Sequence, residues 1–415
     1  MILYILYLSI SPILWIILLI VSLFNKKINT RWKNYKKLLN KSLNKIELTN
    51  KKILLFHAAS NGELEQIKPI IRNINREKYF IILTTSSPSS IGHMPINEID
   101  SYCYQAFDFP WSVNSFFKKV KPENYIITRH DIWPNHIVLS KKYSTNIFLI
   151  NANLPHSSKR LFPIIKYIYK YLFKKFNLVY TVSENMKNKL SELIDIQKIK
   201  IIGDTRFDQI NHRYKTNKQT LPSNFMETKN ILFGSIEHKD LGIIFNAIDN
   251  DFIKQNNIKL IFVPHEPSDE LILSIEKKLA HLKIKSLLLS NPEYEINTDA
   301  LIVDKVGILA DIYKYSLISY IGCGFGKGVH NVIEPAIYGN MICFGPNYHI
   351  LNEATEMINK KLAYLVNNPS DLLDVLKLIN KEDKLTQHSK NIKRYLETKF
   401  DTSSIIIKQI LNDEN

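Results

Sequence analysis

The sequence is poor in cysteine, in glycine and in arginine. Its 415 residues include three cysteines and twelve glycines. The cysteines, Cys103, Cys323 and Cys343, have no C-x-x-C spacing and form no even set, so they fit a reducing compartment better than a disulfide framework. We find no D-x-D-like pair of acids to bind a divalent metal and no Cys/His cluster for zinc. We therefore expect neither a metal nor a cofactor.

The net charge of +16 comes almost wholly from lysine. A nucleic-acid-binding protein would more often show arginine clusters with interleaved aromatic residues, so we expect no nucleic-acid partner. The excess fits surface solvation and attraction to an anionic membrane or substrate. Because 45% of the residues are hydrophobic, the chain can bury the cores of two or three ordinary domains.

Residues 1–24 carry no charge and are almost wholly apolar. A helix needs ~20 such residues to cross the hydrocarbon core of a bilayer. Six basic residues follow between Lys26 and Lys37, which predicts that the rest of the chain is cytoplasmic. A cleaved signal peptide fits less well, because there is no basic start and no small-residue cleavage site. Residues 1–25 are thus predicted to be a membrane anchor, either spanning or lying in the interface since Pro12 could kink it.

From Lys51 onward, short apolar segments alternate with amphipathic ones, which predicts an α/β fold with parallel sheets. We expect a first domain over 26–208, a polar linker over 209–229 and a second domain over 230–415. Two doubly wound domains of this kind hold a ligand in the cleft between them, at the carboxyl ends of their strands.

In the first domain, Ser60, Asn61, Gly62 and Glu63 follow the expected strand 53–57. Glu63 would lie in the first turn of a helix. There it could simply complement the helix dipole, or it could accept a proton from an attacking hydroxyl. The helix end would make it a weaker base.

Three further motifs follow strands of this domain. Asp131 lies in the block 128–135 before Trp133 and Pro134, where a cap would explain it structurally. The segment 151–158 could be only an Asn/Ser-rich turn. Arg206, one of few arginines, is a candidate anion ligand.

The second domain offers Ser235 and His265 after strands, and then a glycine-rich segment over 322–328. Its spacing matches neither a Walker loop nor the G-x-G-x-x-G pattern. Gly324, Gly326, Lys327 and Gly328 could cradle a phosphate through backbone N–H groups, or could form a plain strand-to-helix turn.

His330, Asn331 and Glu334 are expected on the first turns of the next helix, with His330 and Glu334 on one face. Glu334 could accept hydrogen bonds from the two hydroxyls of a ribose. The alternative is an ordinary surface pair.

In this order, the motifs resemble the bacterial 3-deoxy-D-manno-octulosonic acid (Kdo) transferases over nearly the whole chain. The resemblance rests on the apolar N-terminus, on 59–63, on 133–135, on 151–158, on 203–208, on Gly234-Ser235, on Pro264-His265 and on Gly328 to Pro335. It implies a GT-B fold, with two Rossmann-like domains facing across a cleft. It also implies inverting transfer of Kdo from CMP-Kdo to a lipid A precursor at the cytoplasmic face of the inner membrane, without a metal. Glu63 would be the base and the second domain the CMP site.

The sequence departs from the family pattern at several motif positions. Arg129-His130-Asp131 stands where the family has Glu-Thr-Glu, so that only Asp131 keeps a carboxylate. His265 replaces an arginine, Val329 a glycine and Asn153 an arginine. Two other interpretations therefore stay open: a membrane-associated GT-B enzyme that uses a UDP-sugar, and a membrane-tethered binding protein that has lost catalysis.

Overall fold

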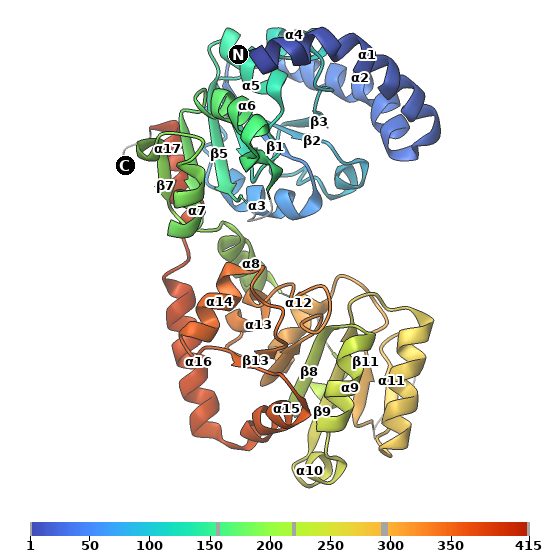
Figure 1. Ribbon diagram of the computed structural model, residues 1–415. Coiled ribbons are helices and arrows are strands. Elements are labelled where there is room, and N and C mark those ends of the chain that lie inside the picture. The colour runs from blue at the N-terminus through green and yellow to red at the C-terminus, as the bar shows by residue number, and fades with distance from the viewer. Residues whose placement is uncertain (1, 155–157, 218–220, 292–297, 413–415) are drawn as a thin grey trace. The chain divides into compact units, whose positions relative to one another are not determined.

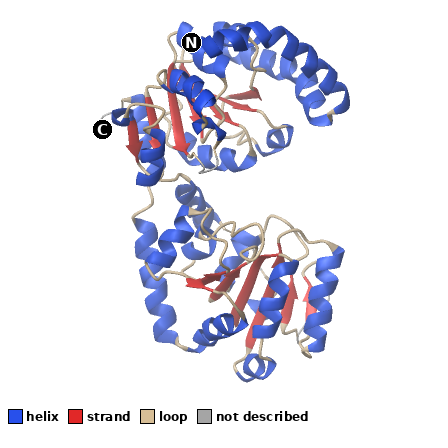
Figure 2. Cartoon of the chain, in the orientation of Figure 1, coloured by secondary structure: helices blue, strands red, loops and turns tan. Residues whose placement is uncertain are grey.

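The computed structural model describes residues 2–154, 158–217, 221–291 and 298–412. The chain forms two compact units, the first made of Met1–Gln209 and Lys399–Asn415 and the second of Ile210–Thr398. Each unit has a seven-stranded sheet with helices against it (Figures 1 and 2). The predicted α/β class with parallel sheets is confirmed.

The sheet of the first unit has the order β3-β2-β1-β4-β5-β6-β7, with every pair parallel. Its central strands are buried along most of their length, as expected of strands that are covered on both faces. The strands are β1 Lys52–Ala58, β2 Tyr79–Thr85, β3 Ser101–Tyr104, β4 Asn124–Thr128, β5 Asn146–Ala152, β6 Leu178–Thr181 and β7 Ile199–Ile201. The helices are α1 Ile2–Phe24, α2 Lys26–Ile46, α3 Asn61–Arg72, α4 Pro110–Val120, α5 Pro134–Lys142, α6 Pro163–Phe173, α7 Glu184–Leu190 and α17 Thr402–Leu411, with 3₁₀ turns η1 Pro88–His93, η2 Lys159–Leu161 and η3 Ile196–Lys198.

The second sheet has the order β10-β11-β9-β8-β12-β13-β14, again with every pair parallel. Its strands are β8 Lys229–Ile236, β9 Ile258–Pro264, β10 Ser286–Leu288, β11 Ala300–Ile302, β12 Ile318–Ile321, β13 Met341–Phe344 and β14 Tyr364–Leu365. Its helices are α9 His238–Ala247, α10 Asn250–Gln255, α11 Asp269–His281, α12 Leu309–Ile312, α13 Ile333–Ile337, α14 Asn352–Asn359, α15 Pro369–Leu376 and α16 Glu382–Glu397, with 3₁₀ turns η4 Ser223–Phe225, η5 Tyr313–Tyr315 and η6 Lys377–Asn380.

The apolar N-terminal segment forms one helix, α1, which packs on the first unit beside α2 (Figure 1). By length and composition, this 23-residue helix could cross a membrane. Two of its tyrosines are nevertheless bonded to the unit: the Tyr4 hydroxyl donates to Asn135 Oδ1 at 2.9 Å and the Tyr7 hydroxyl to Asp108 Oδ2 at 2.8 Å. The opposite side of α1 exposes a row of large apolar residues that includes Ile13, which is 60% exposed.

The structure differs from the expected domain layout at both ends of the second domain. The segment 209–229 is not wholly a linker, because α8 (Arg206–Thr216) occupies its first part. The C-terminal helix α17 belongs to the first unit, so the prediction that the second domain extends to residue 415 is wrong there. Ile406 and Ile410 of α17 lie in the apolar core that contains Ile67 of α3. The isoleucine-rich sequence of this tail does not indicate which of the two sheets the helix packs against.

The docking of α17 yields a stability prediction with a neighbouring control. Ile406 is fully buried, so Ile406→Ala should lower the free energy of unfolding by about 2–5 kcal/mol through lost burial and a residual cavity. Ile405 is 43% exposed, and Ile405→Ala should stay within about 0.5 kcal/mol of the unmodified protein. Urea unfolding measures both. Equal effects of the two changes would contradict this packing of α17.

Candidate active site

The predicted residues of the first unit meet where two strands far apart in sequence lie side by side. The chain leaves β1 toward β2 on one side, while β4 pairs with β1 on the other. Such a reversal of strand order opens a crevice at the carboxyl ends of the strands, where α/β proteins bind ligands. Glu63 follows β1 and Asp131 follows β4, so both lie at this point.

The Glu63 carboxylate is buried, at 5% exposure, in the first turn of α3. Its Oε2 accepts a hydrogen bond from the Ala59 N–H at 2.7 Å. Burial raises the pKa of Glu63 above its usual range, and outweighs the lowering by the Ala59 bond and by the charges of His57 and Arg129. The expectation that the helix end makes Glu63 a weaker base is therefore wrong, because desolvation is the larger effect.

His57 and Asp131 form a close pair beside Glu63, in which the His57 ring is fully buried and the Asp131 side chain is partly buried. His57 Nε2 lies 2.7 Å from Asp131 Oδ2, and its Nδ1 lies 3.0 Å from Thr84 Oγ1. Both ring nitrogens therefore have a polar partner, as a buried histidine requires.

Asp131 stays ionised in this environment. Burial acts to raise the pKa of Asp131, but the hydrogen bond and charge of His57 and a 2.9 Å bond from Trp133 Nε1 together lower it. The suggested capping role is absent, since Trp133 occupies the N-cap position of α5 and Pro134 its first turn. Asp131 instead orients two side chains at the end of β4.

The other predicted residues of the first unit play mixed roles. Ser60 caps α3 by accepting a 3.4 Å bond from the Glu63 N–H. Gly62 has open space where a side chain would be, and Asn61 Oδ1 is buried with no hydrogen-bond partner among the described residues. An orphaned acceptor next to open space is what a ligand site would leave unfilled. Arg206 is held by Asp204, with Nη2 2.8 Å from Oδ2, so much of its charge is compensated within the unit.

The segment 151–158 is described only in part, because 155–157 lie outside the described residues. Asn151 has a positive φ of 49°, and its side chain bonds both the hydroxyl and the N–H of Thr205. Asn151, near the end of β5, thus joins that strand to the loop after β7.

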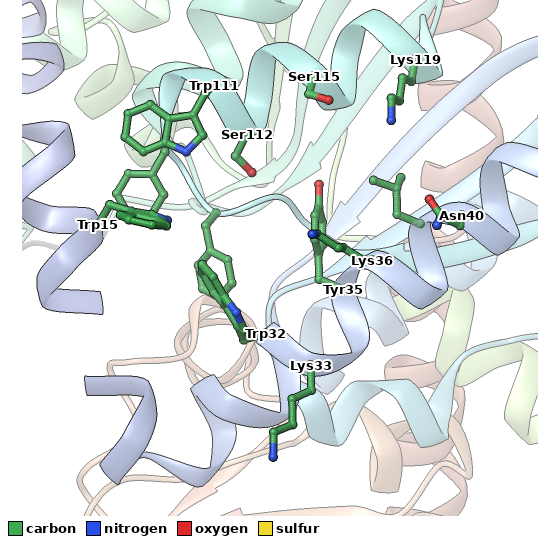
Figure 3. Close-up of a pocket in the computed structure, with 13 residues that line it drawn as sticks. Trp15, Trp32, Lys33, Tyr35, Lys36, Asn40, Trp111, Ser112, Ser115 and Lys119 are labelled. Atoms are coloured by element: carbon green, nitrogen blue, oxygen red, sulfur yellow. The ribbon is translucent and has the colours of Figure 1, made fainter. Parts of the chain in front are cut away.

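A cavity of about 610 Å³ lies in the first unit, lined by α1, α2, α4 and the segment before α4 (Figure 3). Trp15 and Trp111 meet edge to face at 6.3 Å, and Phe109 stacks on Trp111 at 5.4 Å. Lysines also line it, among them Lys33, Lys36 and Lys119. Aromatic walls with several ammonium groups suit an amphiphile that carries anionic groups.

In the second unit, the predicted residues gather at the corresponding reversal, where β12 pairs with β8. Ser235 ends β8, His265 follows β9, and the glycine-rich segment 322–328 follows β12. A cavity of about 310 Å³ there is lined by His265, Lys327 and Glu237, among others.

Close packing against neighbouring backbone atoms is the main reason for the glycines of this segment. A Cβ on Gly322 would lie 2.4 Å from the Ser235 carbonyl oxygen, and one on Gly324 would lie 2.6 Å from the Gly345 nitrogen. Gly328 has a positive φ of 114°. Several N–H groups of the segment already donate within the unit: those of Gly322, Cys323, Gly326, Gly328 and Val329. Phosphate binding by this backbone stays a prediction.

The helix after this segment is shorter than expected. α13 begins at Ile333, so His330 and Asn331 precede it and His330 does not share a helical face with Glu334. Asn331 Oδ1 accepts from the N–H groups of Ile333 and Glu334, at 3.0 and 3.3 Å. The helix has only five residues between its caps Val332 and Tyr338, which is too short for the strong dipole that the prediction assumed.

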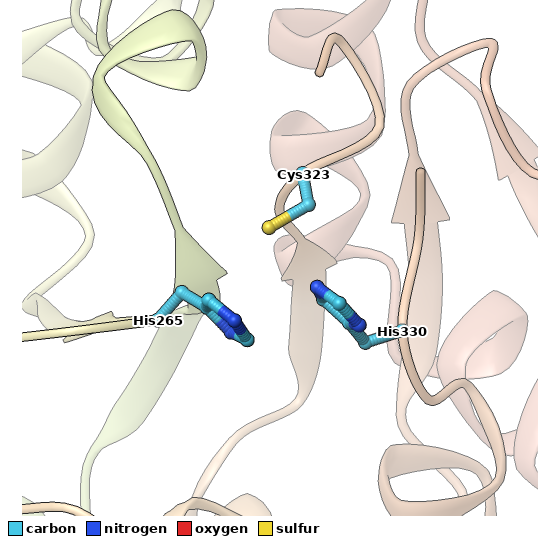
Figure 4. A group of neighbouring side chains, drawn as sticks. All are labelled: His265, Cys323 and His330. Atoms are coloured by element: carbon cyan, nitrogen blue, oxygen red, sulfur yellow. The ribbon is translucent and has the colours of Figure 1, made fainter. Parts of the chain in front are cut away.

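His265, Cys323 and His330 lie close together, with their donor atoms within 4.8 Å of one another (Figure 4). The prediction that the chain has no Cys/His cluster is therefore wrong, since the loop after β9 supplies His265 and the loop between β12 and α13 supplies Cys323 and His330. A D-x-D spacing does occur at 249–251, but Asp249 caps α10, at the start rather than the carboxyl end of β9.

Sequence reasoning missed His57 and Cys323 as members of these two groups. His57 could have been suspected, since a histidine ending a buried strand needs a polar partner. Cys323 gave no such signal.

Comparison with known proteins gives a consistent family. The family model described as "3-Deoxy-D-manno-octulosonic-acid transferase (kdotransferase)" matches residues 26–209. The chain is 30% identical over 356 residues to the 3-deoxy-D-manno-octulosonic acid transferase of Aquifex aeolicus, covering 83% of this chain and 92% of that protein. The enzyme of the same name from Rickettsia prowazekii is 26% identical, with 86% and 80% covered. The crystal structure of UDP-GlcNAc 2-epimerase from Neisseria meningitidis has the same fold, with a TM-score of 0.64 at 14% identity, covering 87% of this chain and all of that one.

The His57–Asp131 pair predicts that replacing one carboxylate oxygen of Asp131 by an amide nitrogen destabilises the protein. Asp131→Asn removes the carboxylate charge from the 2.7 Å contact with the buried His57 ring and should lower the free energy of unfolding at neutral pH by about 1.5–3 kcal/mol, the usual value of a hydrogen bond to a charged group. The pKa of Asp131 is lowered in the folded state, so its contribution is complete above the unfolded pKa and is lost as pH falls through the folded pKa. The difference from the unmodified protein should therefore stay constant from neutral to mildly acidic pH and shrink only in strong acid.

Asp374→Asn is the control, because Asp374 is exposed on α15. Guanidinium unfolding at several pH values measures all three proteins. A loss at Asp131 no larger than at Asp374 would contradict this contact.

Proposed function

The chain belongs to the family of 3-deoxy-D-manno-octulosonic acid transferases, and we propose that it moves Kdo from CMP-Kdo to a lipid A precursor. The family membership makes it a glycosyltransferase. The donor and the acceptor are inferred from that membership together with the chemistry of the two sites. The observation that carries the assignment is a buried carboxylate, Glu63, at the strand-order reversal of the first unit.

Glu63 is proposed as the general base. An acceptor hydroxyl oxygen attacks the anomeric carbon of Kdo, its proton passes to the Glu63 carboxylate, and the bond from that carbon to the CMP phosphate oxygen breaks. The electron pair leaves with CMP, and the configuration inverts. A base with a raised pKa takes the proton more readily, and burial supplies that rise here.

His57 and Asp131 are proposed to position Glu63 and its substrate. His57 acts to lower the pKa of Glu63, and Asp131 fixes the orientation of the His57 ring through the 2.7 Å contact at Nε2. Asn61 and Gly62 border the open space at the start of α3, where the hydroxyl would arrive.

The acceptor lipid is proposed to use the aromatic cavity beside α1. Its tryptophans offer apolar surface to acyl chains, and lysines such as Lys36 offer charge to phosphates. The exposed apolar side of α1 and the basic helix α2 would rest on the cytoplasmic face of the inner membrane. The hydrogen bonds of Tyr4 and Tyr7 to the unit support a helix that lies in the interface over one that spans it.

The second unit is proposed to hold CMP-Kdo. Lys327 and the N–H groups of the glycine-rich segment that remain available would meet the phosphate, and Glu334 would meet the ribose hydroxyls. Stabilising the phosphate as it leaves lowers the barrier directly. His265 and His330 border this region and complete the predicted donor contacts.

Product mass spectrometry tests the reaction. Purified protein is incubated with a lipid A precursor and either CMP-Kdo or a UDP-sugar. We expect a mass increase of one or more Kdo units with CMP-Kdo alone. Transfer only from a UDP-sugar, or from neither donor, would overturn the proposal.

Glu63→Gln predicts loss of turnover without loss of donor binding. Removing a general base costs roughly 10²–10⁴-fold in kcat, whereas calorimetric affinity for CMP should be unchanged. Glu65→Gln is the control, since Glu65 lies on the same helix and pairs with Lys68. In the unmodified enzyme, kcat/KM should fall as pH drops through the raised pKa of Glu63, because protonation removes the base. Full activity of the Glu63 variant would reject the role.

A further inference from the structure

We propose that His265, Cys323 and His330 form a binding site for a borderline-soft divalent transition-metal ion, with Zn²⁺ as the best match. Imidazole and thiolate are the ligands that such ions prefer. The site shares His265 and His330 with the proposed donor contacts, but metal binding is measured on the protein alone and does not require the transfer reaction.

The geometry of the three side chains is close to that of a metal site. Their donor atoms lie within 4.8 Å of one another, His265 coming from the loop after β9 and the other two residues from the loop after β12 (Figure 4). Around Zn²⁺, with bonds of about 2.0–2.3 Å, tetrahedral donors lie roughly 3.3–3.8 Å apart. The two imidazoles now stack in parallel, 4.4 Å between centroids and 3° between planes. Both are exposed, so rotation about their side-chain bonds can bring the nitrogens together.

Ser235 supports two of the three ligands from behind. Its hydroxyl lies 2.9 Å from His265 Nδ1, which leaves Nε2 of that ring for an ion. Its carbonyl oxygen accepts the Cys323 S–H at 3.2 Å. On binding, Cys323 loses that proton to solvent and its sulfur becomes a thiolate ligand.

The backbone at this place is held in an uncommon conformation. Ser235 and Cys323 have φ values of 57° and 64°, in the left-handed region that favours glycine. Residues that hold such a conformation without being glycine cluster at functional sites. Gly322, between β12 and Cys323, keeps the two loops in contact, because any Cβ there would meet the Ser235 carbonyl.

The surroundings of the cluster also suit a metal ion that has one exchangeable ligand. Glu237 lies next to Cys323 and adds negative charge. Three protein ligands leave the fourth position of a tetrahedral ion for water or an anion, as in zinc sites that exchange a ligand. The two exposed histidines leave that position facing solvent.

Cobalt titration of the chelator-treated, full-length protein tests the site. Co²⁺ adopts the same tetrahedral geometry, and a thiolate ligand gives it a charge-transfer band in the near ultraviolet. We expect that band to saturate at one equivalent and to be displaced by Zn²⁺. Calorimetry with Zn²⁺ should show the same stoichiometry.

Two variants assign the ligands. Cys323→Ser should abolish the charge-transfer band. His265→Gln, at an exposed position where folding is not at risk, should weaken Zn²⁺ binding by more than the roughly 10–100-fold typical of losing a partner behind a ligand. Cys103→Ser and His281→Gln are matched controls and should leave both measurements unchanged, because Cys103 is buried in the first unit and His281 is exposed at the end of α11.

Several outcomes would overturn the site. They are a titration without a charge-transfer band, a band that persists in Cys323→Ser, or equal losses of affinity in His265→Gln and His281→Gln.

Discussion

Parallel pairing between strands that are distant in sequence is the constraint on which both sites depend. In the first unit His57 of β1 lies opposite Ile127 of β4, and in the second Gly234 of β8 lies opposite Ile321 of β12. Each pairing brings two carboxyl ends together at the point where the strand order reverses. The loops that follow these strand ends leave a crevice between them, in which their side chains can converge on a ligand.

In the first unit, desolvation sets the chemistry. Glu63 sits at a helix start, which favours a carboxylate, yet burial raises its pKa. His57 is accommodated without exposure because Thr84 and Asp131 satisfy its two nitrogens. A buried carboxylate of raised pKa accepts a proton more readily than an exposed carboxylate does. Such a group suits the proposed role of Glu63 toward an attacking hydroxyl.

In the second unit, close backbone packing sets the geometry. The glycines of 322–328 let the β8 and β12 loops approach closely, and Ser235 and Cys323 at this contact have left-handed conformations. The same packing that makes the segment compact thereby delivers a thiol to two histidines. The segment 322–328, whose sequence suggests a phosphate-binding loop, thus also contributes to a Cys/His cluster, and such a cluster prefers a metal ion.

The sequence by itself determined the α/β class, the parallel strands, the apolar N-terminal helix and the motif order that carries the family, because each is written in local hydrophobic pattern and short spacing. It also indicated Glu63 and Asp131, since both follow apolar strands directly. Tertiary structure decided the rest: the contact of His57 with Asp131, the raised pKa of Glu63, the pairing of Arg206 with Asp204, the packing of α17 in the first unit and the meeting of Cys323 with two histidines. These depend on burial and on contacts between loops far apart in the chain, and neither quantity can be read from neighbouring residues.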